Sequence, residues 1–234
     1  MNVDVLMPVY GTPLEWVKEA LTSIRSQTVK GFNLVIVDDN NPPGPLRDLL
    51  YEQATCKCKT TIVRTEENRG LAAALNAGLK ACTGDIVIRM DADDIAHPSL
   101  VEHHIDFFTK YPERHICGVQ IKLMTTNKSW YSQHTSVVTR LDAYNYPGFW
   151  LINHPGVAYR RETVMQLGGY GDIPSNLAED YALWVKFLLS GRIIYNSKKV
   201  LVDYRVHPRT TNQAPDRHTV EWSDFLKQQK ELLK

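Results

Sequence analysis

The sequence contains no apolar stretch that approaches the roughly 20 residues needed to span a bilayer. Its first residues also lack the basic segment, apolar core and cleavage site of a secretory signal. We therefore expect a protein without an integral membrane segment, located in the cytoplasm or at the periphery of a membrane. Because it has no internal repeat or low-complexity linker, the chain of 234 residues is expected to form one well-buried domain.

The net charge is small and cysteines are few. The formal net charge is +1, so there is no overall basic field that would demand nucleic acid. The four cysteines include Cys56 and Cys58, but the second pair that a zinc site requires is missing, and we expect reduced thiols. Residues 181–234 hold ten Lys and Arg against five Asp and Glu. This excess suits an anionic acceptor, a phospholipid surface or a nucleotide diphosphate, and a solvated basic face has the same composition.

The first half of the sequence does contain a regular alternation of strand and helix patterns. Continuous apolar runs predict strands at Val3–Val9, Leu34–Val37, Thr60–Arg64 and Ile86–Met90. Apolar residues at helical spacing predict helices after Thr12, Pro45, Gly70 and Pro98. The first of these helices opens on a capping-box pattern. This order is typical of an α/β fold whose mostly parallel central sheet is flanked by helices.

The second half is less regular. It predicts strands at Cys117–Thr125, Val157–Arg160 and Val200–Val206, with helices at Glu179–Leu189 and at the C-terminus. The polar and aromatic segment Thr126–Asn153 shows no clear period. Since it is long for an unstructured loop, we expect hairpins or a mobile flap there.

Two acidic clusters each follow an apolar run of the first half. Asp38 and Asp39 follow the second run, and Asp91-Ala92-Asp93-Asp94 follows the fourth. Gathered carboxylates repel one another and resist desolvation unless a cation or a hydrogen-bond donor engages them. In an open α/β sheet, ligands bind in the crevice beyond the carboxyl ends of the strands. The clusters therefore predict a metal and a nucleotide held side by side at one sheet edge.

Each acidic cluster also has a plainer interpretation. Asp91 and Asp93 supply hard oxygen ligands that suit Mg²⁺ or Mn²⁺ shared with phosphate, and the alternative is a turn with a helix cap. Asp94 is expected to be structural or to support the other two. Asp38 and Asp39 either cap the short helix that follows or accept a hydrogen bond from a nucleobase or ribose hydroxyl.

Single residues near predicted element ends are further candidates. Arg69 precedes an Ala-rich helix whose N-terminus attracts phosphate, although a surface arginine in a turn has the same pattern. Asp180 begins an apolar helix and is a general-base candidate, while composition alone favours helix capping. Tyr10 is placed to stack on a base or to pack in the core. His154 and His207 lie on predicted loops, where contact with phosphate, metal or acceptor competes with simple packing.

Nine short pieces occur in a characteristic order: Leu6–Tyr10, Val35–Asn40, Asn68–Leu71, Leu75–Gly78, Arg89–Asp94, His154-Pro155, Gly168–Tyr170, Glu179–Tyr181 and Tyr204–His207. Together they resemble the inverting family 2 glycosyltransferases of GT-A fold, from Val3 to about Asn212. The resemblance implies a Rossmann-like GT-A sheet with a less regular C-terminal acceptor-binding half. It divides the single domain 1–234 into a nucleotide-sugar-binding half (1–115), an acceptor-binding half (116–212) and a C-terminal helix (213–234).

The resemblance also implies how the donor is bound. Pro8, Tyr10 and Asp39 would hold the base of a nucleotide sugar, usually uridine, with Asp38 supporting that pocket. Three positions depart from the family pattern. Many relatives have Arg where this chain has Leu75, Gly11 stands where Asn is common, and Asn41-Pro42 replaces a usual Ser.

The remaining implied roles concern the diphosphate, the metal and the acceptor. Arg69 is the candidate for the phosphate contact that an arginine at position 75 would make, and Asp91 and Ala92 would contact the donor. Asp93, with Asp91 directly or through water, would hold Mn²⁺ or Mg²⁺ against the diphosphate. His207 lies where related enzymes close a C-terminal segment over the diphosphate, and is a candidate metal ligand. Asp180 would deprotonate the acceptor hydroxyl.

We therefore predict a metal-dependent, inverting, non-processive glycosyltransferase that moves a sugar from a UDP-sugar to a hydroxyl acceptor. The acceptor is a glycan, a lipid-linked sugar or another hydroxyl compound, and a nucleic acid base stays open. One alternative is a sugar nucleotidyltransferase, but that class has a glycine-rich phosphate loop after its first strand, where this chain has Tyr10-Gly11-Thr12-Pro13. Another is a non-catalytic nucleotide-sugar-binding module.

Overall fold

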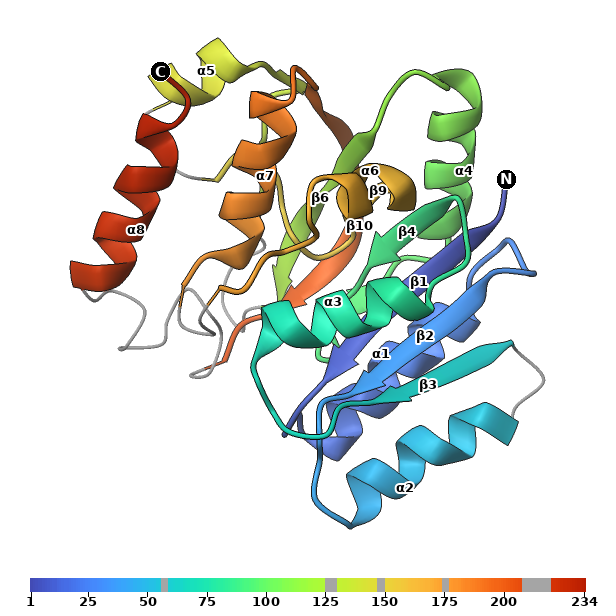
Figure 1. Ribbon diagram of the computed structural model, residues 1–234. Coiled ribbons are helices and arrows are strands. Elements are labelled where there is room, and N and C mark those ends of the chain that lie inside the picture. The colour runs from blue at the N-terminus through green and yellow to red at the C-terminus, as the bar shows by residue number, and fades with distance from the viewer. Residues whose placement is uncertain (56–58, 125–129, 147–149, 174–176, 208–219) are drawn as a thin grey trace.

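The computed structural model describes residues 1–55, 59–124, 130–146, 150–173, 177–207 and 220–234 (Figure 1). Its strands are β1 (Val3–Val9), β2 (Asn33–Asp38), β3 (Thr60–Arg64), β4 (Ile86–Arg89), β5 (Ile95–Ala96), β6 (Ile116–Met124), β7 (Trp130–Tyr131), β8 (Val137–Val138), β9 (Ala158–Arg160) and β10 (Ile194–Arg205). Its helices are α1 (Leu14–Arg25), α2 (Pro45–Glu52), α3 (Leu71–Ala81), α4 (Leu100–Lys110), α5 (Arg140–Asn145), α6 (Arg161–Gln166), α7 (Glu179–Leu189) and α8 (Val220–Glu231), with a 3₁₀ turn η1 (Gln53–Thr55) after α2.

All the strands belong to one mixed sheet. Its order is β3-β2-β1-β4-β9-β6-β10-β5, with β7 paired to β6 and β8 paired to β10. The pairs β1–β2, β1–β4, β2–β3 and β6–β10 are parallel, and β9 runs antiparallel between β4 and β6. The predicted α/β fold with a mostly parallel central sheet is therefore confirmed.

Side chains on the inner strands alternate between two apolar cores, as the twofold period of a strand requires. Leu6, Val35 and Val37 belong to the core that includes residues of α3 and α7, whereas Met7 and Ile36 belong to the core that includes residues of α1 and α4. Figure 1 shows α3 on one side of the sheet and α1 on the other. Because both faces are covered, these strands are apolar at nearly every position, which explains the continuous runs in the sequence.

Helix α3 lies unusually close to the sheet. A Cβ atom on Gly78 would sit 2.3 Å from Leu6 Cδ1 and 2.7 Å from Val37 Cγ2, so only glycine permits this approach. The close packing fixes the N-terminus of α3 beside the carboxyl ends of β1 and β2.

Some element boundaries differ from the sequence-based expectation. The last strand is longer than predicted because β10 starts at Ile194 and carries register shifts between Asn196 and Val202, where Lys198 and Lys199 leave the ladder as exposed side chains. Helix α1 begins without a side-chain cap, since Pro13 occupies the N-cap position, so the capping box predicted there is wrong.

The segment predicted to be irregular forms short elements where the structure describes it. Between Trp130 and Asn153 lie β7, β8 and α5, and the positions 126–129 and 147–149 of that segment are outside the described residues. Cys56 and Cys58 are outside them too, while Cys82 and Cys117 are buried free thiols. Among the described helices, none has the length and apolar character required to cross a membrane.

Candidate active site

A cavity of about 430 Å³ opens at the carboxyl ends of β1, β2 and β4. Its lining residues are Pro8–Pro13, Asp39, Asn68, Gly70, Leu71, Ala74, Asp91–Asp93 and His207. The fold thus brings most of the predicted donor-binding and metal-binding residues to the lining of one cavity. The N-terminus of α3, with Gly70 as its N-cap, forms one side of this space and presents its positive dipole end to it.

Tyr10 and Asp39 lie on the side of the cavity formed by β1 and β2. The Tyr10 side chain is 55% exposed, so it does not pack in the core and is open to stacking. Asp39 is only 3% exposed, and its Oδ1 accepts a hydrogen bond of 2.8 Å from Thr65 Oγ1. Burial raises the pKa of Asp39, the charge of Asp38 adds to this rise, and the Thr65 hydrogen bond opposes it.

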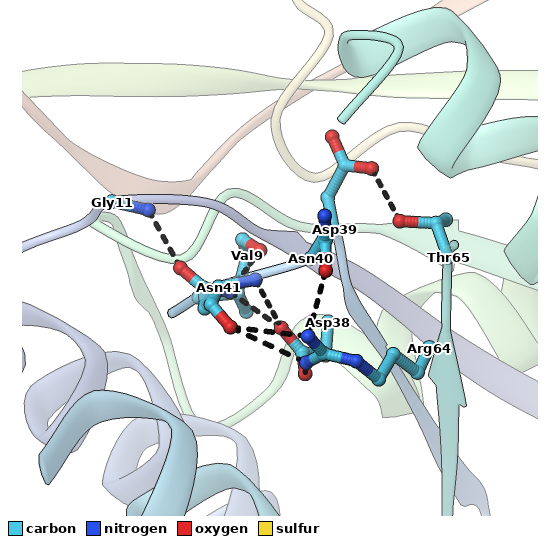
Figure 2. A network of polar contacts seen from close by, with 8 residues as sticks. All are labelled: Val9, Gly11, Asp38, Asp39, Asn40, Asn41, Arg64 and Thr65. Carbon is cyan, nitrogen blue, oxygen red and sulfur yellow. Dashed lines mark hydrogen bonds and ion pairs between the residues drawn. The ribbon is translucent and has the colours of Figure 1, made fainter. Parts of the chain in front are cut away.

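Asp38 has a different environment from its neighbour (Figure 2). It is fully buried, pairs with Arg64, and accepts hydrogen bonds from the backbone and side-chain nitrogens of Asn41 at 2.9 and 2.7 Å. Asn41 in turn accepts from the backbone of Gly11 at 2.9 Å and donates to that of Val9 at 2.8 Å. Asp38 therefore fixes the loop after β2 to the turn after β1 and does not line the cavity. It does not cap α2 either, which begins after Gly44 without a side-chain cap.

The turn after β4 gathers three carboxylates. Oxygen atoms of Asp91, Asp93 and Asp94 lie within 4.8 Å of one another. Burial raises the pKa of Asp91, and the charges of Asp93 and Asp180 add to this while the paired Arg89 opposes it. The pKa of Asp94 is raised well above its usual value by burial and by the charges of Asp91 and Asp93.

These carboxylates fit a divalent cation. Asp94 Oδ2 is buried and has no hydrogen-bond partner within the described ranges, which is costly unless a positive charge lies nearby. Crowded carboxylate oxygens are the hard ligands that Mg²⁺ and Mn²⁺ prefer. His207 Nε2 lies 2.9 Å from Asp93 Oδ2, so this histidine is also within reach of an ion held there.

The end of β10 holds the acidic turn in place. The backbone nitrogen of Arg205 donates to Asp94 Oδ1 at 2.8 Å, and its Nε donates to the Asp93 carbonyl oxygen at 2.8 Å. The same guanidinium pairs with Glu19 and lies 5.1 Å from the ring centroid of Trp16. The His207 ring centroid is 4.8 Å from that of Trp16, so α1 supports both residues.

Asp180 lines a second, smaller cavity of about 120 Å³. This cavity shares Leu71 and Asp91 with the larger one, so the two spaces adjoin. Asp180 lies in the first turn of α7, where its Oδ1 accepts from the backbone nitrogen of Tyr181 at 2.8 Å. Trp150 lines the smaller cavity and also a third one of about 340 Å³ beside β8 and α5.

Arg69 and His154 do not line the larger cavity. The Arg69 side chain is 62% exposed and lines a separate surface cavity, 3.9 Å from Glu67 and 3.8 Å from Asp172. His154 lines the cavity of Asp180, and its Nε2 lies 3.0 Å from the Tyr170 hydroxyl oxygen. The structure thus leaves the phosphate contact proposed for Arg69 without support from its position.

Sequence reasoning missed Arg89, Arg205 and Trp16. Arg89 had a usable signal, since it is a lone charge inside an apolar strand pattern and is only 1% exposed. Arg205 lies in the Tyr204–His207 piece, but the piece alone assigns it no contact. Trp16 had no signal, because the contacts of both residues join positions that are far apart along the chain.

Comparison with known proteins finds a matching family and similar proteins. A family model described as glycosyl transferase family 2 matches residues 4–168. An Escherichia coli protein named UDP-Gal:alpha-D-GlcNAc-diphosphoundecaprenol beta-1,3-galactosyltransferase is 34% identical over 213 residues, which is 90% of this chain and 76% of that protein.

Solved structures show the same fold. S. aureus TarS in complex with UDP-GlcNAc superposes with a TM-score of 0.74 at 19% identity, covering 98% of this chain and 66% of that one. The mannosyltransferase PcManGT from Pyrobaculum calidifontis, in complex with GDP-Man and Mn²⁺, gives 0.67 at 22% identity, covering 90% and 58%. The chain thus spans less than two thirds of these solved chains.

Proposed function

Because the chain belongs to glycosyl transferase family 2 and is an enzyme that transfers glycosyl groups, we propose that it moves a sugar from a UDP-sugar to an acceptor hydroxyl with inversion. One observation carries this proposal. The cavity with the acidic turn adjoins the cavity with Asp180, and Asp91 lines both. A donor diphosphate in the first and an acceptor hydroxyl in the second would meet at their junction.

We call the larger cavity the donor cavity, because its lining suits a nucleotide. Tyr10 offers an exposed ring for stacking, and Asp39 is a buried acceptor for a hydrogen bond from the base. The N-terminus of α3 supplies backbone N–H groups and a positive dipole end for the diphosphate. We propose uridine as the base because the E. coli relative is named for UDP-Gal, although PcManGT holds GDP-Man.

Asp91, Asp93 and His207 are the proposed holders of a divalent cation, either Mn²⁺ or Mg²⁺. Such an ion neutralises the charge that grows on a departing diphosphate. Asp91 and Asp93 would position the donor through this ion. Arg205 holds the turn that carries them, through hydrogen bonds to Asp94 and to the Asp93 carbonyl oxygen.

Asp180 is the proposed general base. An alcohol is a poor nucleophile until a base accepts its proton during attack. The carboxylate of Asp180 lines the smaller cavity from the first turn of α7, which supports this role. Holding the two reactants in line supplies the entropic part of the rate enhancement. Attack from the side opposite the diphosphate would invert the anomeric carbon.

The acceptor is proposed to be a lipid-linked sugar, as the name of the E. coli relative indicates for that protein. Its sugar would enter the cavity of Asp180. Trp150 lines both that cavity and the third one, which offers further space for the acceptor. Within one domain, residues 1–115 are therefore the proposed donor half and residues 116–212 the proposed acceptor half.

A thermal-shift screen of nucleotide sugars, with and without Mn²⁺, tests this function. We expect a UDP-sugar with Mn²⁺ to raise the melting temperature, and EDTA to remove both this shift and the slow hydrolysis of the donor. An Asp93→Asn variant should lose the metal-dependent part of the shift. Hydrolysis that persists after thorough chelation would refute the metal, and release of diphosphate from UTP and a sugar phosphate would indicate a nucleotidyltransferase instead.

A further inference from the structure

A cavity of about 510 Å³ lies at the edge of the sheet opposite the donor cavity. It is formed by the residues that precede β4, β6 and β10 and by the end of β9, together with α6. Strand β4 connects the two edges, from Asp85 at this cavity to Asp91 at the donor cavity. Six residues of extended chain place them about 20 Å apart. The two cavities are therefore separate sites.

Three arginines line this cavity, namely Arg160, Arg161 and Arg192. Within the described residues, none of them has a carboxylate at ion-pair distance. Asp85 and Glu162 also line the cavity, where Asp85 accepts a hydrogen bond from the Asn2 backbone and Glu162 accepts one from Gln166. Three guanidinium groups against these two carboxylates leave the lining with a net positive charge.

Backbone carbonyl groups hold two of these arginines. Arg160 donates from Nε to the Arg114 carbonyl oxygen at 2.9 Å and from Nη2 to that of Pro112 at 2.6 Å. Arg161 donates from Nε to the Leu79 carbonyl oxygen at 3.1 Å. Anchoring through neutral oxygens fixes the guanidinium groups while leaving their charges and remaining N–H groups for another partner. An anion bound there would meet a site that is already ordered.

Arg192 gives an independent sign of a missing partner. Its Nε is buried and, among the residues that the structure describes, has no hydrogen-bond partner, a need that a bound water or ion would meet. His115 lines the same space and reports the local charge. Burial lowers the pKa of His115, and the positive charges of Arg192 and Arg160 lower it further.

We propose that this cavity binds a phosphate-bearing anion, held by Arg160, Arg161 and Arg192, at a site distinct from the donor cavity. Its volume lies in the range of small-ligand pockets. Planar guanidinium groups match the oxygens of phosphate with paired hydrogen bonds, which favours phosphate over a simple halide. The ligand is either a soluble phosphate compound or the headgroup of an anionic lipid.

Calorimetric titration with inorganic diphosphate tests the proposal. EDTA is present so that no metal ion mediates binding in the donor cavity, and NaCl keeps the ionic strength constant. We expect saturable binding that Arg192→Met weakens about tenfold, since one charge-assisted contact is lost. Arg47→Met removes the same charge from α2, outside this cavity, and should bind as the unmodified protein does. Arg161→Met provides a second test should the first variant fold poorly.

Absence of saturable binding overturns the proposal. So does equal binding by Arg192→Met, or an equal loss in Arg47→Met, because either result would mean a diffuse charge effect. Competition by phosphatidylglycerol vesicles, but not by phosphatidylcholine vesicles, would identify a lipid headgroup as the source, and no competition would identify a soluble phosphate. Donor hydrolysis should stay within about twofold in Arg192→Met, so this site and the proposed transfer reaction can fail separately.

Discussion

Neighbouring carboxylates in this protein have different tasks because the backbone turns them to different sides. Asp38 and Arg64 are register partners on adjacent strands, so their side chains lie on the same face and form an ion pair between a buried carboxylate and a partly exposed guanidinium. Asp39 is one residue further on and faces the donor cavity, beside Thr65. A single-residue step along the chain thus separates a structural acid from one that lines the cavity.

At the residue scale, Asp180→Asn should lower the rate of transfer by roughly two to four orders of magnitude, as expected for a lost general base. Asparagine keeps the size of the side chain but cannot accept the proton. Donor binding, measured by the thermal shift with a UDP-sugar and Mn²⁺, should change little because Asp180 lies outside the larger cavity.

Asp106→Asn is a matched control for that variant. It removes one carboxylate from the exposed side of α4, away from both cavities, and should leave transfer unchanged. Near-normal turnover by Asp180→Asn would remove this residue from the mechanism.

Among the elements, the end of β10 has the largest influence on the site. Its Arg205 contacts the carbonyl oxygen of Asp93 and the carboxylate of Asp94, and also pairs with Glu19 on α1. The strand therefore ties the acidic turn to α1. Such outer contacts set the orientation of metal ligands.

We predict that Arg205→Ala weakens the binding of Mn²⁺ in the presence of UDP by about 10- to 100-fold, the usual cost of losing an outer-shell partner. Calorimetry measures the affinity. The fluorescence of Trp16 should also change, because the guanidinium lies 5.1 Å from its ring centroid.

The control for Arg205→Ala comes from the same strand. Lys199→Ala removes an exposed cation where β10 leaves the ladder, and should bind the ion normally. If Arg205→Ala matches it in affinity, the contacts to the acidic turn have no part in metal binding.

For the whole molecule, one sheet includes strands from residues 1–115 and from residues 116–212. Strand β9, from the second half, pairs with β4 on one side and with β6 on the other. The core on the α3 face likewise joins Leu75 and Leu79 to Trp184 and Phe187 of α7. Neither half completes its own core, which argues for a single folding unit.

We therefore predict that urea unfolds the protein, residues 1–234, in one cooperative transition. Far-ultraviolet circular dichroism and tryptophan fluorescence should give coincident curves, since the shared core melts as one. Two separated transitions would instead show that the halves are independent domains.

Local patterns in the sequence predicted the strands, the helices and the acids at strand ends. They did not predict the contacts between residues that are distant in the sequence. The apolar runs predicted four parallel strands, and the acids after two of them lie at the donor cavity or directly behind it, as the rule for strand ends requires. Arg69 differs, because the chain before α3 turns its side chain toward Glu67 and Asp172. Nothing in the local spacing indicates that direction.

The sequence by itself determined the alternation of elements and the acidic residues at strand ends, since both depend on short-range periodicity and on the cost of burying charge. The tertiary structure alone decided that β9 inserts between β4 and β6, that Arg205 holds the acidic turn, and that Asp180 adjoins Asp91. These contacts join residues that are far apart in the chain. Only the packing of the completed sheet brings such residues within contact distance.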